Sequence, residues 1–373
     1  FLILPIFLLF CFCTKKEEFK YKNSDLPVQE RIDDLISRMT LKEKVAQLQI
    51  EDFIYDYTDT VKLYEQLKNG LGMLSSYQLS LEKTVESRNL IQKFVIDNTR
   101  LGIPVIFLDE GLHGLMKPDA TSFPQAIGLA CSWDTELYEK VYTVVAHEMR
   151  SRGAQIALSP VLDVCRDPRW GRVEETYGED PFLNGMLASA AIKGFQGSAE
   201  GTIAPGHVAA TLKHLVGHGE PENGLNISPC NKSERVLREF HMLPFKMAVD
   251  SVKPYTVMAS YNEIDGVPSH KNKWLLKKVL RDEWGFDGML ISDFGGIEML
   301  YERHKVANTP QDAALQAYEA GIEIALPGNF YAHLPQLVKE GKINEDDIDK
   351  AVAKILHLKF ISGLFDNRYS DLE

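Results

Sequence analysis

The sequence predicts an α/β fold in which strands and helices alternate along one domain. Short apolar runs recur from about residue 26 onward, and stretches with helical periodicity separate them. The runs are rich in Val, Ile, Leu and Met and show no clear polar–apolar alternation, which is typical of strands covered on both faces. This pattern predicts either a (β/α)8 TIM-type barrel, complete, incomplete or irregular, or an open doubly wound sheet.

Strands and helices can be placed from these patterns. Many of the helical stretches begin after Asp, Ser or Asn, which cap helix N-termini, and end near Gly. The expected strands are 103–108, 154–159, 208–213, 255–260, 288–292 and 321–326. The expected helices include 134–151, 183–195, 233–251, 272–283 and 311–320.

Polar residues that follow the apolar runs decide between the two folds. Polar residues lie at the ends of four predicted strands: Glu110, Tyr261 and Asp293 each follow one, and Lys213 and His214 close another. A barrel brings the carboxyl ends of its strands to one rim, where active sites are built. The sequence lacks both glycine-rich phosphate loops, so dinucleotide and nucleoside triphosphate chemistry is disfavoured. The barrel is therefore the predicted fold.

Composition excludes several functional classes. The chain has 373 residues, 45% of them hydrophobic, and a net charge of −12. This charge disfavours nucleic acid as a partner and suits a neutral substrate. The cysteines show no metal-ligand spacing and no disulfide framework, so we expect no metal and no cofactor. They are Cys11, Cys13, Cys131, Cys165 and Cys230.

The first residues are typical of an export signal. Residues 1–13 are almost wholly apolar and a charged segment, 14–18, follows them. The stretch is too short to cross a bilayer, which takes roughly 20 residues. Cys11 or Cys13 could carry the lipid of a bacterial lipoprotein, and simple secretion is the alternative. We therefore expect a periplasmic, outer-membrane or cell-surface bacterial protein whose residues 1–25 are a truncated signal and charged spacer.

Five motifs follow one another along the sequence. They are DEGLHG at 109–114, RDPRWGR at 166–172 with YGEDP at 177–181, KH at 213–214, YN at 261–262 and SDF at 292–294. Together they make the region from residue 26 to the end resemble glycoside hydrolase family 3, whose first domain is a (β/α)8 barrel. That resemblance implies a catalytic barrel at 26–362.

The resemblance implies a role for each candidate residue. Asp293 is the expected catalytic nucleophile, Tyr261 is expected beside it, and Phe294 is a candidate wall of the sugar pocket. Lys213, Arg172 and His214 are expected to act as cationic neighbours that favour the ionised form of Asp293, which forms the glycosyl-enzyme intermediate. The residues expected to bind the hydroxyls of the terminal sugar are Glu110, Arg172, Lys213 and His214.

Each candidate also has a structural interpretation. Asp293 could cap a helix beginning at Gly296, and Glu110 could be a solvated loop carboxylate. Arg172 could belong to a surface ion-pair network with the acidic residues that follow it. Lys213 and His214 could emerge into solvent at a strand end, and Phe294 could be a core residue. The number and order of the motifs favour the functional interpretation.

A retaining mechanism also needs a carboxyl group as general acid and base, roughly 5–5.5 Å from the nucleophile. The family's β-N-acetylglucosaminidase branch carries an Asp-His pair in the loop after the KH motif, but residues 217–226 lack it. In the larger branch this group is a Glu of a following α/β-sandwich domain, and residues 363–373 resemble the start of the linker to it. That domain is the expected source of the acid. Glu220 and Glu222 are outside candidates.

The expected partner is a β-linked oligosaccharide or β-glycoside. An exo-acting retaining β-D-glucosidase is the first expectation, with β-xylosidase as the alternative. Glu110 replaces an Asp and Phe294 replaces a Trp that many family β-glucosidases carry, and both changes leave the sugar open. A non-catalytic sugar-binding barrel and a metal-dependent barrel hydrolase are the alternatives from other classes.

Overall fold

The computed structural model describes residues 19–51, 59–75, 79–197 and 202–371, which form a closed parallel barrel. Its seven strands pair in the order β1-β2-β3-β4-β5-β6-β9, and every pair is parallel. The strands are β1 (Ile50–Glu51), β2 (Met73–Ser75), β3 (Ile106–Asp109), β4 (Ile156–Ala157), β5 (Ala209–Leu215), β6 (Thr256–Ala259) and β9 (Met289–Ile291).

Residues 324–325 take the eighth position and close the ring. Ile324 pairs in parallel with Ile291, and Ala325 pairs in parallel with Gln49 beside β1. Two backbone hydrogen bonds of 2.9 Å, from Ser292 to Ile324 and from Ile50 to Ala325, complete the closure. The predicted (β/α)8 barrel is therefore confirmed, although its eighth strand is reduced to two bridging residues.

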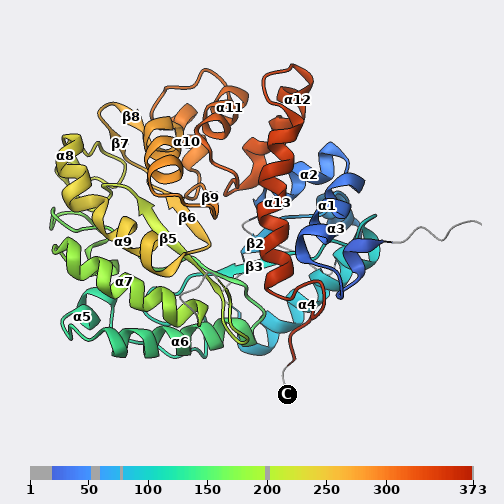
Figure 1. Cartoon of the computed structure of the whole chain (residues 1–373), viewed down its shortest axis with the longest axis horizontal. Helices are drawn as coiled ribbons and strands as arrows, with labels where there is room; N and C mark the ends of the chain where they lie inside the picture. Colours follow the sequence, from blue (N-terminus) through green and yellow to red (C-terminus); the bar gives the residue numbers. More distant parts are fainter. Residues whose placement is uncertain (1–18, 52–58, 76–78, 198–201, 372–373) are drawn as a thin grey trace, which may run out of the picture.

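Helices surround the barrel (Figure 1) and occupy the predicted segments. Asp134 and Asp180 cap α6 and α7 through their side chains, as expected from the sequence. The predicted helix 233–251 is divided into α8, a π-helical turn at 237–241, and α9, whose second residue, Pro244, cannot donate a backbone hydrogen bond. The relevant bounds are α6 (Thr135–Ser151), α7 (Pro181–Gln196), α8 (Glu234–Val236), α9 (Leu243–Val252), a π-helix (Trp274–Glu283) and α11 (Pro310–Ala320).

The remaining helices and one hairpin complete the fold. The hairpin of β7 (Glu263–Ile264) and β8 (Val267–Pro268) follows β6 directly and is antiparallel. In the described part of the chain, no helix combines the length and apolar character needed to cross a bilayer. The other α-helices are α1 (Val28–Arg38), α2 (Leu41–Gln47), α3 (Thr60–Leu67), α4 (Leu81–Asn98), α5 (Ala126–Ala130), α10 (Gly296–Glu302), α12 (Leu334–Lys339) and α13 (Glu345–Ile361).

Segments from both ends of the sequence pack onto the barrel. The predicted export segment lies largely outside the described residues, but Tyr21 is buried and its hydroxyl donates to the Leu101 carbonyl at 2.8 Å. After α13, Asp366 pairs with Arg31 at 3.0 Å. Residues 19–25 and 363–371 thus contact the barrel, although the sequence suggested a spacer and the start of a linker.

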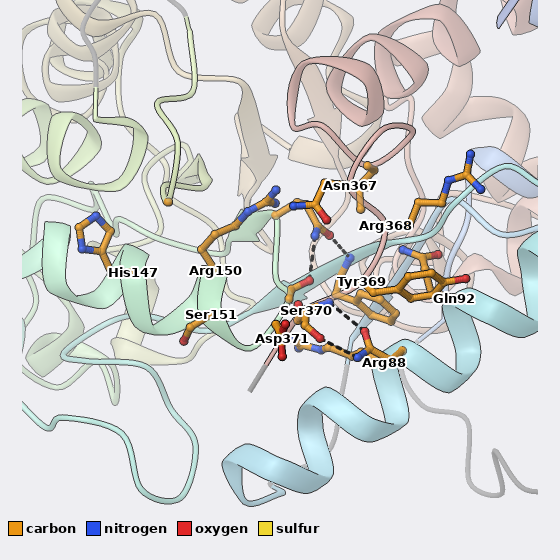
Figure 2. Close-up of a pocket in the computed structure, with 16 residues that line it drawn as sticks. Arg88, Gln92, His147, Arg150, Ser151, Asn367, Arg368, Tyr369, Ser370 and Asp371 are labelled. Carbon is orange, nitrogen blue, oxygen red and sulfur yellow. Dashed lines mark hydrogen bonds between the residues drawn. The ribbon is translucent and has the colours of Figure 1, made fainter. Parts of the chain in front are cut away.

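The C-terminal segment also lines a cavity of about 340 Å³ between α4 and α6 (Figure 2). Asn89 of α4 holds this segment by donating to the Ser370 carbonyl at 2.8 Å and accepting from its N–H at 3.0 Å. Gly153 and Gln155, which precede β4, place the cavity at the amino end of that strand. The predicted site residues, all of them described, do not line it.

Candidate active site

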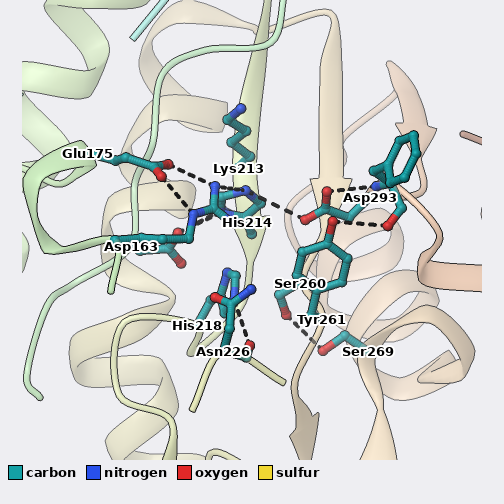
Figure 3. A network of polar contacts seen from close by, with 12 residues as sticks. Asp163, Glu175, Lys213, His214, His218, Asn226, Ser260, Tyr261, Ser269 and Asp293 are labelled. Atoms are coloured by element: carbon teal, nitrogen blue, oxygen red, sulfur yellow. Dashed lines mark hydrogen bonds and ion pairs between the residues drawn. The ribbon is translucent and has the colours of Figure 1, made fainter. Parts of the chain in front are cut away.

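The structure brings the predicted site residues together at the carboxyl ends of the strands, and Figure 3 shows Lys213, His214, Tyr261 and Asp293 among them. The Lys213 ammonium contacts both oxygens of Glu110, at 3.0 and 2.8 Å. His214 Nε2 lies 3.0 Å from a guanidinium nitrogen of Arg172 and 3.6 Å from Oδ2 of Asp293. These groups come from β3, β5, β9 and the loop after β4, so the barrel topology assembles the cluster.

Asp293 is buried at the end of β9 and does not cap α10. Residue Gly295 occupies the N-cap of that helix, and no side chain caps it. Oδ1 of Asp293 instead accepts the N–H of Phe294 at 2.7 Å, while its own N–H donates to His270 Nε2 at 3.0 Å. Its Oδ2 is buried without a hydrogen-bond partner in the described structure. The helix-cap interpretation is therefore wrong.

Burial sets the charge state of Asp293. It raises the pKa of this carboxyl from 3.8 to about 6, although Arg172, Tyr261 and Lys213 act in the opposite direction. The sequence predicted that cationic neighbours would favour the ionised form. They do so, but desolvation outweighs them.

His214 is not one of these cationic neighbours. Burial and the charge of Arg172 hold the pKa of its imidazole well below 6.5. Its expected contribution as a positive charge is therefore wrong, because a neutral ring is the form that this environment stabilises.

Arg172 was interpreted either as a site residue or as a member of an ion-pair network, and the structure shows contacts of both kinds. Glu175 accepts two hydrogen bonds from the guanidinium, each of 2.8 Å, across the 3₁₀ turn Val173–Glu175. The same guanidinium also reaches His214 inside the site. Although burial alone would lower the pKa of Arg172, the Glu175 contacts raise it above its ordinary value. Glu175 therefore holds a permanently charged group against the predicted nucleophile.

Lys213 and Glu110 form a second charged pair with unequal exposure. The Lys213 side chain is 4% exposed, whereas that of Glu110 is 39% exposed. The ammonium therefore does not emerge into solvent as the structural interpretation held. The Glu110 carboxylate faces the open side, where a ligand can compete for it.

Tyr261 and Phe294 lie on the other side of Asp293. The Tyr261 hydroxyl donates to the Phe294 carbonyl at 3.0 Å. Burial and the nearby Asp293 raise the pKa of Tyr261, so it stays protonated. Phe294 is 49% exposed, so its interpretation as a core residue is wrong and its ring is available at the mouth of the site.

Sequence reasoning missed Asp163, a fully buried carboxylate behind His214. Its Oδ2 lies 2.7 Å from Nδ1 of His214 and accepts the backbone N–H of the same residue at 3.3 Å. Asp163 follows the apolar residues Val161 and Leu162, so the strand-end argument that found Asp293 could have found it.

Glu220 and Glu222 are engaged elsewhere. Glu220 accepts from Lys232 at 2.7 Å and contacts His241 at 3.1 Å, and the hydrogen bond from His241 lowers the pKa of Glu220 to about 2. Asn231 donates to Glu222 at 2.8 Å. A group with so low a pKa is a poor proton donor, so Glu220 does not suit the role of general acid.

Three potential metal ligands, Asp163, His214 and His218, have ligand atoms within 4.8 Å of one another. Both ring nitrogens of His214 are already engaged, one by Asp163 and one by the Arg172 guanidinium. A divalent cation there would have to displace a hydrogen bond and lie beside a fixed positive charge. The arrangement suits a polar network better than a metal centre.

The fold and the site define the class of protein first. A closed parallel barrel with a buried carboxylate, two cations and an imidazole at the carboxyl ends of its strands has the layout of a barrel enzyme. More specifically, the chain belongs to glycosyl hydrolase family 3, because residues 40–358 match the model of that family's N terminal domain. The resemblance inferred from the motifs is confirmed.

Relatives and solved structures agree with this assignment. A putative beta-xylosidase of Formosa agariphila is 37% identical across 97% of this chain and 50% of its own length. A periplasmic beta-glucosidase of Salmonella typhimurium is 33% identical, with 91% and 43% covered. The Listeria innocua beta-glucosidase in complex with isofagomine is similar in structure, with a TM-score of 0.83, 35% identity, and 92% and 47% of the two chains covered. The chain thus spans about half the length of the relatives it matches.

Proposed function

We propose that the protein is an exo-acting retaining β-glycosidase that releases a terminal non-reducing sugar. The observation that carries the proposal is the position of Asp293, buried at the barrel rim with one carboxylate oxygen unpaired and two cations nearby. β-D-glucosidase is the activity we expect first. β-Xylosidase is the second candidate, because the relatives carry both names and Glu110 replaces the usual shorter Asp.

In the first step an oxygen of Asp293 forms a bond to the anomeric carbon while the bond from that carbon to the leaving oxygen breaks. The leaving oxygen takes a proton from a general acid. In the second step water attacks the same carbon, the ester to Asp293 breaks, and the deprotonated acid takes the proton of the water. Arg172, Lys213, His214 and Glu110 bind the sugar hydroxyls and orient the ring.

The general acid is proposed to be a Glu supplied by a C-terminal domain. Two observations support this. The chain matches an N terminal domain and about half the length of its relatives, and Glu220 and Glu222 are held in other contacts. Export is likewise a proposal, supported by the apolar first residues and by a relative named periplasmic.

An activated 2-deoxy-2-fluoro aryl glycoside tests the proposal, because its leaving group needs little acid assistance. We expect the protein to gain the mass of one fluorosugar, on the peptide that contains Asp293. The matched control is Asp293→Asn, which should remain unlabelled. A protein that binds the sugar without being labelled is a non-catalytic sugar-binding barrel, and that result overturns the proposal.

The sugar is tested with the same leaving group on glucose and on xylose. Faster labelling by the glucoside supports β-D-glucosidase, and faster labelling by the xyloside supports β-xylosidase. Glu110→Asp shortens the side chain beside the sugar and should raise the glucoside-to-xyloside ratio. A ratio that does not respond shows that Glu110 does not sort the two sugars.

A further inference from the structure

Asp163 fixes one side of the His214 imidazole. Both hydrogen bonds that Asp163 accepts arrive at Oδ2, from His214 Nδ1 at 2.7 Å and from its backbone N–H at 3.3 Å. Its other oxygen, Oδ1, is buried without a hydrogen-bond partner in the part of the chain that is described. Burial raises the pKa of Asp163 to about 8. A proton on this carboxyl would sit on Oδ1 and leave Oδ2 an acceptor.

Arg172 fixes the other side of the ring. A guanidinium has donors and no acceptor, so its nitrogen 3.0 Å from His214 Nε2 can only donate. Nε2 must then carry a lone pair, and the one ring proton is on Nδ1, facing Asp163. Because the imidazole is neutral in this environment, only this tautomer satisfies both neighbours.

The tautomer matters because Nε2 also faces Asp293. Its distance of 3.6 Å to Asp293 Oδ2 is short enough that a small shift of either group would form a hydrogen bond if Nε2 carried a proton. Such a bond would draw electron density from the nucleophile. It would also place the Nε2–H of His214 directly opposite an N–H of Arg172, and two donors that face each other repel. With the proton on Nδ1, the oxygen of Asp293 is left unpaired.

We propose that Asp163 is a positioning residue, which holds His214 in the Nδ1–H tautomer so that Nε2 remains an acceptor beside Asp293. The inference rests on the proposed function for its catalytic consequence. The requirement is for an acceptor at the position of Oδ2, not for a negative charge. Asp163→Asn keeps a carbonyl oxygen that can accept both N–H groups, and Asp163→Leu keeps the approximate shape and removes the acceptor.

Nitrogen-15 spectra of the histidine rings in the full chain read the tautomer directly, with His214→Gln to assign the signal. We expect Nδ1 to be protonated and Nε2 unprotonated in the wild type and in Asp163→Asn. In Asp163→Leu the Nε2–H form should appear. A wild-type signal with the proton on Nε2 overturns the proposal, whether or not the protein is a glycosidase.

Kinetics with the activated fluoroglycoside give the second readout. The labelling rate constant of Asp163→Leu should fall roughly 10²-fold or more, as when a histidine is left in the wrong tautomer, with little change in the concentration giving half-maximal rate. Asp163→Asn should stay within about tenfold of the wild type. If Asp163→Asn keeps the Nδ1–H tautomer and is nevertheless as slow as Asp163→Leu, the charge matters and not the acceptor, and the proposal is wrong.

A matched variant separates positioning from loss of stability. Thr211 lies on β5, the strand that carries His214, and Thr211→Val removes its buried hydrogen bond to Thr256 of β6 without changing a residue hydrogen-bonded to the ring. At equal loss of unfolding free energy, it should leave both the tautomer and the labelling rate unchanged. If the wild type is not labelled, the proposed function fails, and the ring spectra still decide the tautomer.

Discussion

Two buried clusters of charge lie at the carboxyl end of the barrel, and they are built differently. At the end of β3, Asp109 accepts from Arg88 at 2.8 Å with each oxygen and from Lys117 at 3.0 Å. The three side chains are 2–3% exposed. Asp163, in the loop after β4, and Asp293, just after β9, are also buried, but each has an oxygen without a hydrogen-bond partner in the described structure.

The difference distinguishes an anchor from a reactive site. A buried carboxylate whose oxygens are both paired is stabilised, and here it fixes the start of the loop that carries Glu110. A buried carboxylate with an unpaired oxygen costs free energy and has a raised pKa, which is the pattern of functional groups. Asp109 belongs to the same motif as Glu110, but its carboxylate is paired with Arg88 and Lys117, whereas that of Glu110 contacts Lys213 in the site.

The largest expected effect is the loss of activity on changing Asp293 to Asn. The labelling rate with the fluoroglycoside should fall by roughly 10⁴-fold or more, because the amide cannot form the ester. At pH 7 the unfolding free energy should rise by up to about 3 kcal/mol, because the variant removes a buried carboxylate whose pKa is raised from 3.8 to about 6. Urea denaturation measures this gain.

The pH dependence of the unfolding free energy is the control for the stability gain of Asp293→Asn. The folded pKa lies above the unfolded one, so the native state binds more protons between pH 4 and 6 and the wild type loses stability as pH rises through that window. The difference between the variant and the wild type should therefore vanish below about pH 4. A variant that is destabilised at pH 7 would show that Asp293 also has a structural role.

Asp109→Asn should have the opposite profile. Removing its charge leaves Arg88 and Lys117 buried without their shared carboxylate, which typically costs about 3–5 kcal/mol. The labelling rate per folded molecule should change little at temperatures where the variant is folded. Urea denaturation with activity measured on the same samples separates the two quantities. Loss of activity without loss of stability would contradict the assignment of Asp109 as an anchor.

The third prediction concerns the acidic side of the pH–rate profile. Labelling requires ionised Asp293, so the rate constant should fall tenfold per pH unit well below the pKa of about 6. The fluoroglycoside has no titrating group in this range, so the profile reports the enzyme. An acidic limb centred near 4 would mean that the cations around Asp293 outweigh its burial.

Most of the fold could be predicted from the sequence, but two of the barrel strands could not. The six predicted strands correspond to β3, β4, β5, β6, β9 and the bridging residues 324–325, because each is a run long enough to recognise. β1 was not predicted because polar residues flank Ile50. β2 was not predicted because Gly72 breaks its apolar run. That glycine is needed because a Cβ there would lie 2.0 Å from the Gln47 carbonyl oxygen.

The sequence predicted which residues form the candidate site, but it did not predict their charge states. Residues after strand ends could be listed from order alone, and the structure brings them together. The neutral state of His214 and the raised pKa of Asp293 depend on burial, which the sequence does not display. Asp163 could be found from its place after a strand, but its role depends on two hydrogen bonds to one ring.

Glu110→Gln gives the smallest expected effect. It compares the half-exposed charge pair of Glu110 with the buried charge pairs of Asp109. The Glu110 side chain is 39% exposed, so its pair with Lys213 is screened by water and should contribute no more than about 1 kcal/mol to stability. The amide oxygen still accepts from Lys213, but the charged acceptor for a sugar hydroxyl is lost, and KM should rise by roughly 10-fold or less. Denaturation and saturation kinetics on an activated glycoside measure both. A stability loss as large as that of Asp109→Asn would show that Glu110 anchors the loop, and that the boundary between anchor and site lies one residue further along the chain.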